Sequence, residues 1–315
     1  MPRSPIIIAH RGASGYLPEH TLAAKALAYG QGADYLEQDV VATRDGRLVV
    51  LHDLHLDDVT DVARRFPGRH RDDGRHYVVD FDLAELESLR VFERRAPGSS
   101  RPKHPARFPA EHELFGIATL MDELRLITGL NKSTGRTVGI YCEIKEPAWH
   151  HAHGIDLAAL LLRELATFGY SRAADPAFVQ CFDSNELIRV RAALGSDLRL
   201  VQLVGREAKY TELLTSDGLR RVAGYAYGLG PHHSQLADQS ADGGPRLLPL
   251  KELADDAGLR LHPYTFRRED VPEYASSFED WLEFFIAGAR VDGLFCDHPD
   301  VAVRVRDSVS KVQRA

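Results

Sequence analysis

The stretch IIIAHRGASGYLPEHTLAAKALAYGQGADYLEQD, residues 6–39, decides the fold class. It contains an apolar run at 6–11, a helical pattern at 19–30 and a second β-rich run at 34–39. A strand, a helix and a strand in this order are typical of a βα unit in a parallel sheet. The stretch therefore predicts an α/β protein.

The same unit repeats along the whole 315-residue chain. We predict eight strands, at 6–11, 34–39, 138–145, 177–183, 198–204, 224–230, 260–267 and 293–298. Helical patterns follow them, at 19–30, 119–130, 156–168, 184–194, 207–222, 246–257, 271–289 and 300–309. Eight repeats are the number in a (β/α)8 barrel, the TIM barrel. We therefore predict one TIM-barrel domain over residues 1–315. A doubly wound open sheet is the alternative, but no glycine-rich dinucleotide loop follows the first strand.

A hairpin interrupts the repeat after the second strand. Asp45-Gly46 lies between two runs rich in apolar residues, which is a strong hairpin signal. With these two residues as the loop, Arg44 pairs with Arg47 and Asp39 lies opposite His52. Opposed residues have Cβ atoms about 5 Å apart. The predicted register therefore brings a histidine to the acidic end of the second strand.

The second interruption is the stretch 54–118, which is charged and rich in arginine, proline, histidine and aspartate. It is too long for a plain loop inside a compact domain. We expect it to form a small inserted subdomain over the mouth of the barrel.

Composition excludes several classes of partner. The formal net charge is -7, so the chain offers no basic field for nucleic acid or an anionic membrane surface. No apolar run reaches the roughly 18 residues needed to cross a bilayer. We therefore expect a small-molecule partner and no stable membrane insertion, and the sequence leaves a homodimer open. The three cysteines, Cys142, Cys181 and Cys296, each lie in a predicted strand and are interpreted as buried free thiols.

Ile6-Ile7-Ile8 is too short for an apolar signal region, so we expect no signal peptide at the start of the sequence as written. The sequence as written is therefore expected to be cytoplasmic. A periplasmic or secreted location is the alternative if a signal has been removed.

Three carboxylates are the candidate metal ligands. Glu37 and Asp39 share one face of their strand, because residues two apart point the same way. Glu143 ends the next strand in order, within Tyr141-Cys142-Glu143-Ile144-Lys145. Burying like charges together is costly unless a cation neutralises them. An all-oxygen set favours a hard divalent cation, Mg²⁺ or Ca²⁺.

Two histidines and two cations would surround this ion. His10 and Arg11 end the first strand, His52 follows the hairpin, and Lys145 follows Glu143. A histidine with an ordinary pKa of about 6.5 can accept or donate a proton near neutral pH. Three carboxylates, a divalent ion, Arg11 and Lys145 sum to about +1, which suits one phosphodiester monoanion. We favour His10 as the base and His52 as the acid, and the sequence leaves the reverse assignment open.

Taken together, these motifs resemble the glycerophosphodiester phosphodiesterase family. The resemblance rests on His10-Arg11-Gly12-Ala13, Pro18-Glu19-His20-Thr21, Glu37-x-Asp39, His52-Asp53 and Glu143-Ile144-Lys145. It looks closest to the larger branch that bacteria secrete to the periplasm, which has a long insertion and similar strands at Gln180-Cys181-Phe182-Asp183 and His262-Pro263-Tyr264-Thr265. The chain departs from that branch in lacking a secretion signal.

The resemblance implies a role for each matching residue. It implies metal binding by Glu37, Asp39 and Glu143, and acid/base catalysis by His10 and His52. It also implies that Arg11 and Lys145 contact the phosphate.

Three more residues are expected to contact the substrate, namely Gln180, Phe182 and Tyr264. For the two aromatic residues, packing in the core is the alternative to forming a wall for a glycerol moiety.

The expected reaction is hydrolysis of glycerophosphodiesters to an alcohol and sn-glycerol 3-phosphate. One alternative is a lipid phosphodiesterase similar to phospholipases C or D, which would need an exposed apolar rim. The other is a non-catalytic barrel that binds a phosphate ligand, which would be expected to lack a ligand or a histidine.

Overall fold

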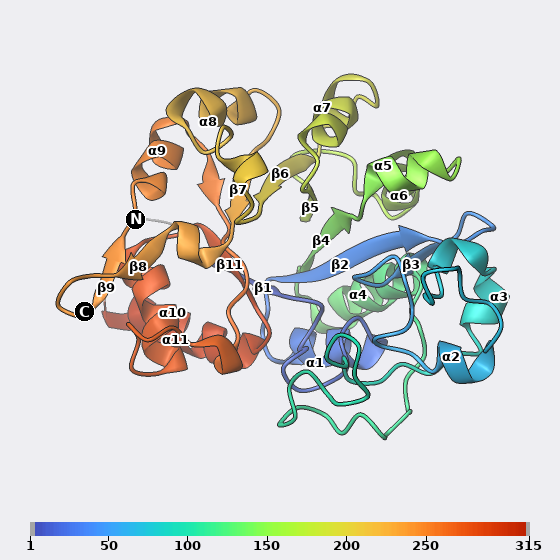
Figure 1. Cartoon of the computed structure of the whole chain (residues 1–315). Coiled ribbons are helices and arrows are strands. Elements are labelled where there is room, and N and C mark those ends of the chain that lie inside the picture. The colour runs from blue at the N-terminus through green and yellow to red at the C-terminus, as the bar shows by residue number, and fades with distance from the viewer. Residues whose placement is uncertain (1–3, 313–315) are drawn as a thin grey trace.

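The computed structural model describes residues 4–312, so the first and last three residues of the predicted domain lie outside the described part. Its centre is a barrel of parallel strands (Figure 1). The strands are β1 (Ile6–Ala9), β2 (Tyr35–Ala42), β4 (Gly139–Ile144), β5 (Ala177–Cys181), β6 (Arg199–Val204), β7 (Gly228–Pro231), β10 (Arg260–Leu261) and β11 (Gly293–Cys296). Neighbours pair in this order from β1 to β10, and β11 pairs with β1 on the other side. The predicted fold class, a (β/α)8 barrel, is confirmed.

The barrel is closed by backbone hydrogen bonds on the side between β10 and β11. The amide of Asp292 donates to the carbonyl of Leu261 at 3.0 Å, and that of Phe295 donates to Pro263 at 3.0 Å. The predicted strand 260–267 is regular only over its first two residues. Pro263 has no N–H to give to the ladder, which accounts for the early end of β10.

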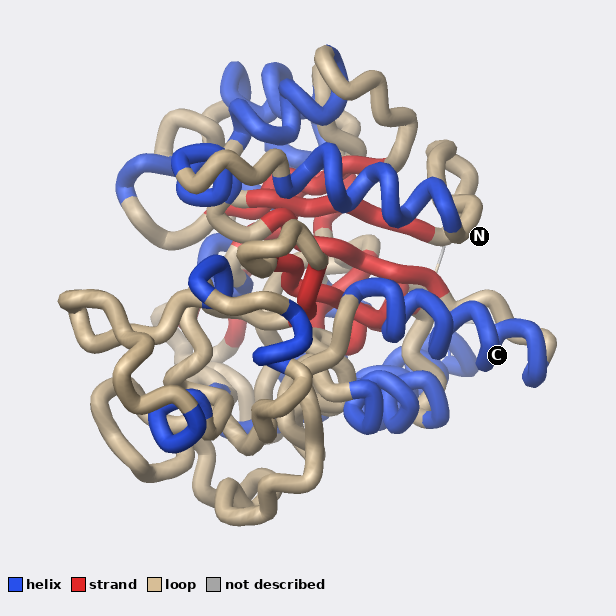
Figure 2. The backbone as a smooth tube through the Cα atoms, turned by 90° about the vertical axis from the view of Figure 1, so that its right-hand side faces the viewer, coloured by secondary structure: helices blue, strands red, loops and turns tan. Residues whose placement is uncertain are grey.

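Helices surround the strands (Figure 2). They are α1 (Leu22–Gly30), α4 (Leu120–Thr134), α5 (Pro147–Ala152), α6 (Leu157–Thr167), α7 (Ser184–Ala192), α8 (Ser216–Ala223), α9 (Leu250–Asp256), α10 (Phe278–Glu283) and α11 (Pro299–Val312). A π-helical segment, η5 (Phe284–Gly288), extends α10, and the short helices η2 (Ala208–Tyr210), η3 (His233–Gln235) and η4 (Arg268–Asp270) lie in loops. A small hairpin pairs β8 (Ala237–Gln239) with β9 (Pro245–Leu247). Among the described residues, none of the helices has both the length and the apolar character to cross a membrane.

Aromatic side chains fill the inside of the barrel. Ile8, Tyr141, Phe178, Val201 and Phe295 form one buried cluster. The rings of Tyr141 and Phe178 stack with centroids 4.6 Å apart. Such a filled interior closes the barrel below its mouth, so ligands have access only at one end.

The cysteines lie on the strands, as predicted. Cys142, Cys181 and Cys296 are buried free thiols and belong to the cluster between the sheet and the helices.

The hairpin forms, but its predicted register is wrong by one residue. β3 (Leu48–Val50) pairs antiparallel with β2, and the pairs are Val40 with Val50, Val41 with Val49 and Ala42 with Leu48. The loop has three residues, because only Gly46 takes a left-handed backbone, with φ at +72°, while Asp45 does not. The amide of Gly46 donates to the carbonyl of Thr43 at 3.0 Å. This matches a type I turn followed by a bulge glycine rather than a two-residue loop.

The corrected register changes the neighbour of Asp39. Its carbonyl accepts from the amide of Leu51 at 3.0 Å, so Leu51 and not His52 lies opposite it. His52 still reaches the barrel mouth, because the chain leaves the strand directly after β3.

The segment 54–118 follows β3 and precedes α4 (Figure 1). It holds only short helices, α2 (Val62–Arg65), η1 (Val78–Asp80) and α3 (Leu83–Leu86). Its apolar side chains pack with Val41 and Val49 of the hairpin in a cluster of their own. Val40 and Val50, on the opposite face of the hairpin, belong to the main core. The hairpin therefore carries the segment on one face and the barrel on the other.

Gly139 at the start of β4 offers a test of the packing. A Cβ here would lie 2.2 Å from Tyr35 Cε1 and 2.5 Å from the carbonyl oxygen of Pro176. Gly139→Ala should therefore lower the free energy of unfolding by about 1–3 kcal/mol, the usual cost of overpacking. Gly30→Ala is the control, because no atom lies within 4 Å of its added Cβ. Equal midpoints of chemical denaturation for the two variants would contradict this account.

Candidate active site

A cavity of about 230 Å³ opens at the carboxyl ends of the barrel strands. It is lined by His10, Arg11, Glu37, Asp39, His52, Glu143, Gln180, Phe182, Leu203, His232, Tyr264, Thr265, Arg267 and Phe295. These residues include nine of the ten that the sequence selected. The tenth, Lys145, contacts the carboxylate of Glu143 at 2.8 Å. The fold thus brings together residues that are far apart in the chain.

The three carboxylates meet because of strand register. β2 and β4 are parallel neighbours in which Asp39 pairs with Glu143. Glu37 lies two residues before Asp39 and so shares its face. Oxygen atoms of all three carboxylates lie within 4.8 Å of one another, and all three residues are buried. The arrangement could hold one metal ion.

The electrostatics of the three carboxylates favour a cation. Burial and the charge of Asp39 raise the pKa of Glu37 well above its usual value. Burial raises the pKa of Glu143 to about 8, although Lys145 opposes the rise. Burial acts against ionisation of Asp39 too, but Lys145 and a hydrogen bond from His20 hold its pKa well below the usual range. Asp39 Oδ1 is buried without a hydrogen-bond partner. An oxygen left free beside two carboxyls that resist ionisation fits a hard divalent ion.

A buried chain of polar groups holds Asp39 from behind. His20 Nε2 lies 2.8 Å from Asp39 Oδ2, and the Lys25 ammonium lies 3.4 Å from His20 Nδ1. Since an ammonium group only donates, His20 Nδ1 accepts and its Nε2–H donates to Asp39. Lys25 is fully buried, contacts Glu123 at 2.9 Å and donates to the carbonyl of Glu37. The sequence signalled His20 only through the Pro18-Glu19-His20-Thr21 motif, and the roles of Lys25 and Glu123 were missed.

Each candidate catalytic histidine is paired with an aspartate. His10 Nδ1 lies 2.6 Å from Asp297 Oδ1, and His52 Nδ1 lies 2.7 Å from Asp53 Oδ1. An ionised carboxylate can only accept, so both Nδ1 atoms carry the proton and both Nε2 atoms are left for other partners. Asp53 was included in the His52-Asp53 motif without a role, and Asp297 was not identified from the sequence.

The pKa values of the two histidines are lower than the sequence led us to expect. Burial, aided by the charge of Arg11, lowers the pKa of His10 to about 4. Burial, with Arg11 and Lys145, lowers the pKa of His52 to about 3. Both rings are therefore neutral near pH 7. An anion bound between them would raise both pKa values, because it stabilises the protonated rings.

Arg11 is held in place by acidic neighbours. Its backbone amide donates to Glu37 Oε2 at 2.7 Å, and its Nη1 lies 3.0 Å from both oxygens of Glu19. Its Nε lies 3.4 Å from Asp39 Oδ2. The charge sum from sequence omitted Glu19, and it also omitted Arg267, which lines the cavity. The net charge of the site therefore depends on more groups than the motifs contain.

The remaining predicted contacts form one wall of the cavity. The Gln180 amide nitrogen donates to Glu37 Oε1 at 3.2 Å, and its oxygen is buried without a partner. The rings of Phe182 and Tyr264 meet edge to face with centroids 5.9 Å apart. The Tyr264 hydroxyl donates to the carbonyl of Val204 at 3.0 Å. Because the hydroxyl is used in this bond, the carbon atoms of the ring are the part of Tyr264 that can form an apolar wall.

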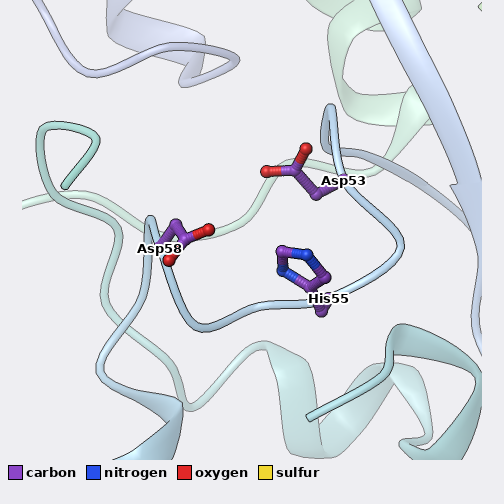
Figure 3. A group of neighbouring side chains, drawn as sticks. All are labelled: Asp53, His55 and Asp58. Carbon is purple, nitrogen blue, oxygen red and sulfur yellow. The ribbon is translucent and has the colours of Figure 1, made fainter. Parts of the chain in front are cut away.

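A second group, Asp53, His55 and Asp58, also has side chains close enough for a metal (Figure 3). Asp53 Oδ2 accepts from Arg94 at 2.6 Å, and both oxygens of Asp58 accept from Arg75 at 3.2 Å. These carboxylates are already neutralised, so we assign no cation to this group.

Fold and site together define a class of protein. A (β/α)8 barrel with histidines and a carboxylate cluster at the carboxyl ends of its strands has the architecture of a barrel enzyme. The sequence model of the glycerophosphoryl diester phosphodiesterase family matches residues 10–301. The chain therefore belongs to this family and is a phosphodiesterase.

Individual proteins agree with the family match. The glycerophosphodiester phosphodiesterase of Haemophilus influenzae is 42% identical over 328 aligned positions, which cover 96% of this chain and 90% of that protein. A crystal structure from Silicibacter pomeroyi superposes with a TM-score of 0.74 at 23% identity and covers 98% of this chain and 95% of its own. A phosphodiesterase of Oleispira antarctica, solved in complex with the product sn-glycerol-3-phosphate, has a TM-score of 0.65 at 21% identity and covers 96% of this chain and 97% of its own.

The raised pKa of Glu143 predicts proton release when a metal binds. At about 8, this pKa keeps the metal-free carboxyl protonated at pH 7. A cation bound to the three carboxylates must displace that proton, so about one proton or more should leave per ion. Calorimetric titration with Mg²⁺ in two buffers of different ionisation enthalpy measures the number. Glu143→Gln should lower it by about one, and an unchanged number would contradict the assignment.

Proposed function

We propose that this phosphodiesterase hydrolyses glycerophosphodiesters to an alcohol and sn-glycerol 3-phosphate. The observation that carries the proposal is a single cavity lined by three buried carboxylates and by two histidines, each of which is hydrogen-bonded to an aspartate. The name of the Haemophilus influenzae relative and the product bound in the Oleispira antarctica enzyme support this substrate class.

The metal site of the proposal consists of Glu37, Asp39 and Glu143. Their oxygen-only set suits Mg²⁺ or Ca²⁺ rather than Zn²⁺, which prefers nitrogen and sulfur. When bound, such an ion supplies positive charge to the phosphoryl oxygens. Arg11 and Lys145 are the side chains that add to this charge.

The substrate would be held by its phosphate and by its glycerol carbons. Arg11, together with Lys145 behind the carboxylates, would attract the phosphodiester anion. Phe182 and Tyr264 present an apolar surface for the carbon chain of the glycerol. Gln180 has a free amide oxygen that can accept from a glycerol hydroxyl.

Two proton transfers complete the reaction. A base removes a proton from the nucleophile, which forms a new P–O bond, and an acid protonates the alkoxide whose P–O bond breaks. The nucleophile is either water or the substrate's own glycerol hydroxyl, which would give a cyclic phosphate for water to open. We retain His10 as base and His52 as acid, and this division stays a prediction. The aspartate partners hold both rings with Nε2 free for these transfers.

Residues 54–118 are proposed as an inserted subdomain of the single catalytic domain. Arg94 and Arg107 in this segment contact Glu19 and Glu269 on barrel loops, which joins the segment to the mouth. Its polar composition favours small deacylated substrates over the lipid phosphodiesterase alternative, which would need an apolar rim.

The metal requirement can be measured directly. Chelation should abolish turnover of glycerophosphocholine, and Mg²⁺ or Ca²⁺ should restore it better than Zn²⁺. Glu37→Gln should lower kcat by at least about 100-fold while the protein stays folded, because one ligand loses its charge. Full activity after rigorous removal of metal would refute the proposal. Release of product from intact phosphatidylcholine instead would favour the lipid enzyme, and no turnover with specific binding of phosphate would favour the non-catalytic barrel.

The two histidines can be distinguished by the leaving group. His10→Ala and His52→Ala should each lose about 10²–10⁴-fold in kcat on glycerophosphocholine and keep their metal affinity. A nitrophenyl ester needs little help from an acid, so it should rescue only the variant that lacks the acid. We expect rescue of His52→Ala. Rescue of His10→Ala alone would reverse the assignment, and equal rescue of both would contradict a division of roles.

A further inference from the structure

Two arginines of the insertion make the same pattern of contacts with the barrel. Arg94 donates to both oxygens of Glu19, at 2.9 and 2.6 Å, and to Asp53 Oδ2 at 2.6 Å. Arg107 donates to both oxygens of Glu269, at 2.7 and 3.0 Å, and to Asp297 Oδ2 at 2.7 Å. Each arginine therefore donates two hydrogen bonds to one glutamate and a third to one aspartate.

These two aspartates are the partners of the two candidate catalytic histidines. Asp297 accepts from His10 with the oxygen that Arg107 does not use, and Asp53 accepts from His52 with the oxygen that Arg94 does not use. The result is two hydrogen-bonded chains of side chains, each in the order histidine, aspartate, arginine. Both end in the segment 54–118.

We propose that the insertion is part of the catalytic apparatus, with Arg94 positioning His52 through Asp53 and Arg107 positioning His10 through Asp297. This inference rests on the proposed function, in which both histidines transfer protons. It makes the two arginines positioning residues, because neither has to touch the substrate.

The physical reason lies in what an aspartate needs to hold a histidine. A carboxylate bonded through one oxygen only can rotate, and a buried one is stable as an anion only when it is paired. An arginine on the second oxygen fixes the rotation and keeps the charge. The fixed Oδ1 then requires a proton on the histidine Nδ1, so the lone pair of Nε2 stays available for the reaction.

The two chains are not equally protected against loss of their arginine. Asp297 Oδ2 also accepts from Arg267 Nε at 3.0 Å. Among the side-chain hydrogen bonds of the described residues, those of Asp53 come only from His52 and Arg94. Loss of Arg94 should therefore affect His52 more than loss of Arg107 affects His10.

Glutamine variants of the holoenzyme test the proposal. Arg94→Gln should lower kcat on glycerophosphocholine by roughly 10–100-fold, with the affinity for Mg²⁺ nearly unchanged, and Arg107→Gln should have a smaller effect in the same direction. KM should change less than kcat, and any rise would come from Glu19, which binds both Arg94 and Arg11. The control is Arg69→Gln in the same insertion, because Arg69 binds Glu85 and the carbonyl of Asp80 and touches neither chain. Equal losses in all three variants would mean that the arginines only stabilise the insertion, and would overturn the proposal.

Double variants separate positioning from general damage. In the His52→Ala background, Arg94→Gln should cost little further kcat, whereas in the His10→Ala background it should cost its full factor, because only coupled sites deviate from additivity. Arg107→Gln should show the opposite pattern. Full additivity in every pair would overturn the inference. If Arg94→Gln does not fold, Arg94→Lys keeps the buried charge but cannot make three bonds in a fork. It should lose part of the activity, and wild-type kcat would count against the proposal.

A spectroscopic measurement makes the result independent of the substrate. In protein labelled with ¹⁵N-histidine, the ring nitrogens of His52 should report a single tautomer, protonated at Nδ1, in the wild type and in Arg69→Gln. Arg94→Gln should shift these signals toward a mixture of tautomers. Unchanged ring signals would overturn the proposal even if kcat falls. Normal hydrolysis by the wild type with unchanged rings in the variants would refute only this inference, whereas no hydrolysis of any glycerophosphodiester would refute the proposed function.

Discussion

Three acidic side chains are buried close together at the mouth of the barrel, and many of the surrounding contacts compensate their charge. Glu37, Asp39 and Glu143 are at most 5% exposed, and their oxygens lie within 4.8 Å of one another. Like charges at such distances in a poorly solvated place are unstable without nearby positive charge. Most of the surrounding structure supplies that charge or fixes the geometry.

The supporting groups lie in layers around the carboxylates. Arg11 lines the cavity and contacts Asp39, Lys145 contacts Glu143, and His20 and Lys25 form a buried chain of contacts to Asp39. The positive groups need their own partners, and Glu19 and Glu123 fill that need. Charge compensation thus spreads from the barrel mouth into helices α1 and α4.

The strand β2 joins this network to the insertion. It carries Glu37 and Asp39 inside the barrel and then continues beyond the rim, where Val40 and Val41 point into two different cores. Side chains alternate between the two faces of a strand, which places both carboxylates on the same face. The same alternation directs Val41 toward the segment 54–118. The carboxylate cluster and the attachment of the segment 54–118 therefore depend on one continuous strand.

The barrel and nine of the residues that line its cavity could be predicted from the amino-acid sequence. Repeated βα units indicate the fold because hydrophobic periodicity is a local property. Glu37, Asp39 and Glu143 could be placed at strand ends for the same reason. The ends of parallel strands converge in any barrel, so a residue at a strand end needs no further information to be brought near the others.

The orientation and the charge of these residues depend on contacts between segments that lie far apart in the chain. The hairpin register depended on whether Asp45 or only Gly46 adopts positive φ, which local sequence leaves ambiguous. The low pKa values of His10 and His52 arise from burial, which no motif contains. Asp297 reaches His10 from 287 residues away in the chain. Packing between folded segments brings such partners, including Arg94 and Arg107, into contact. The spacing of residues along the chain does not indicate which distant residues will meet.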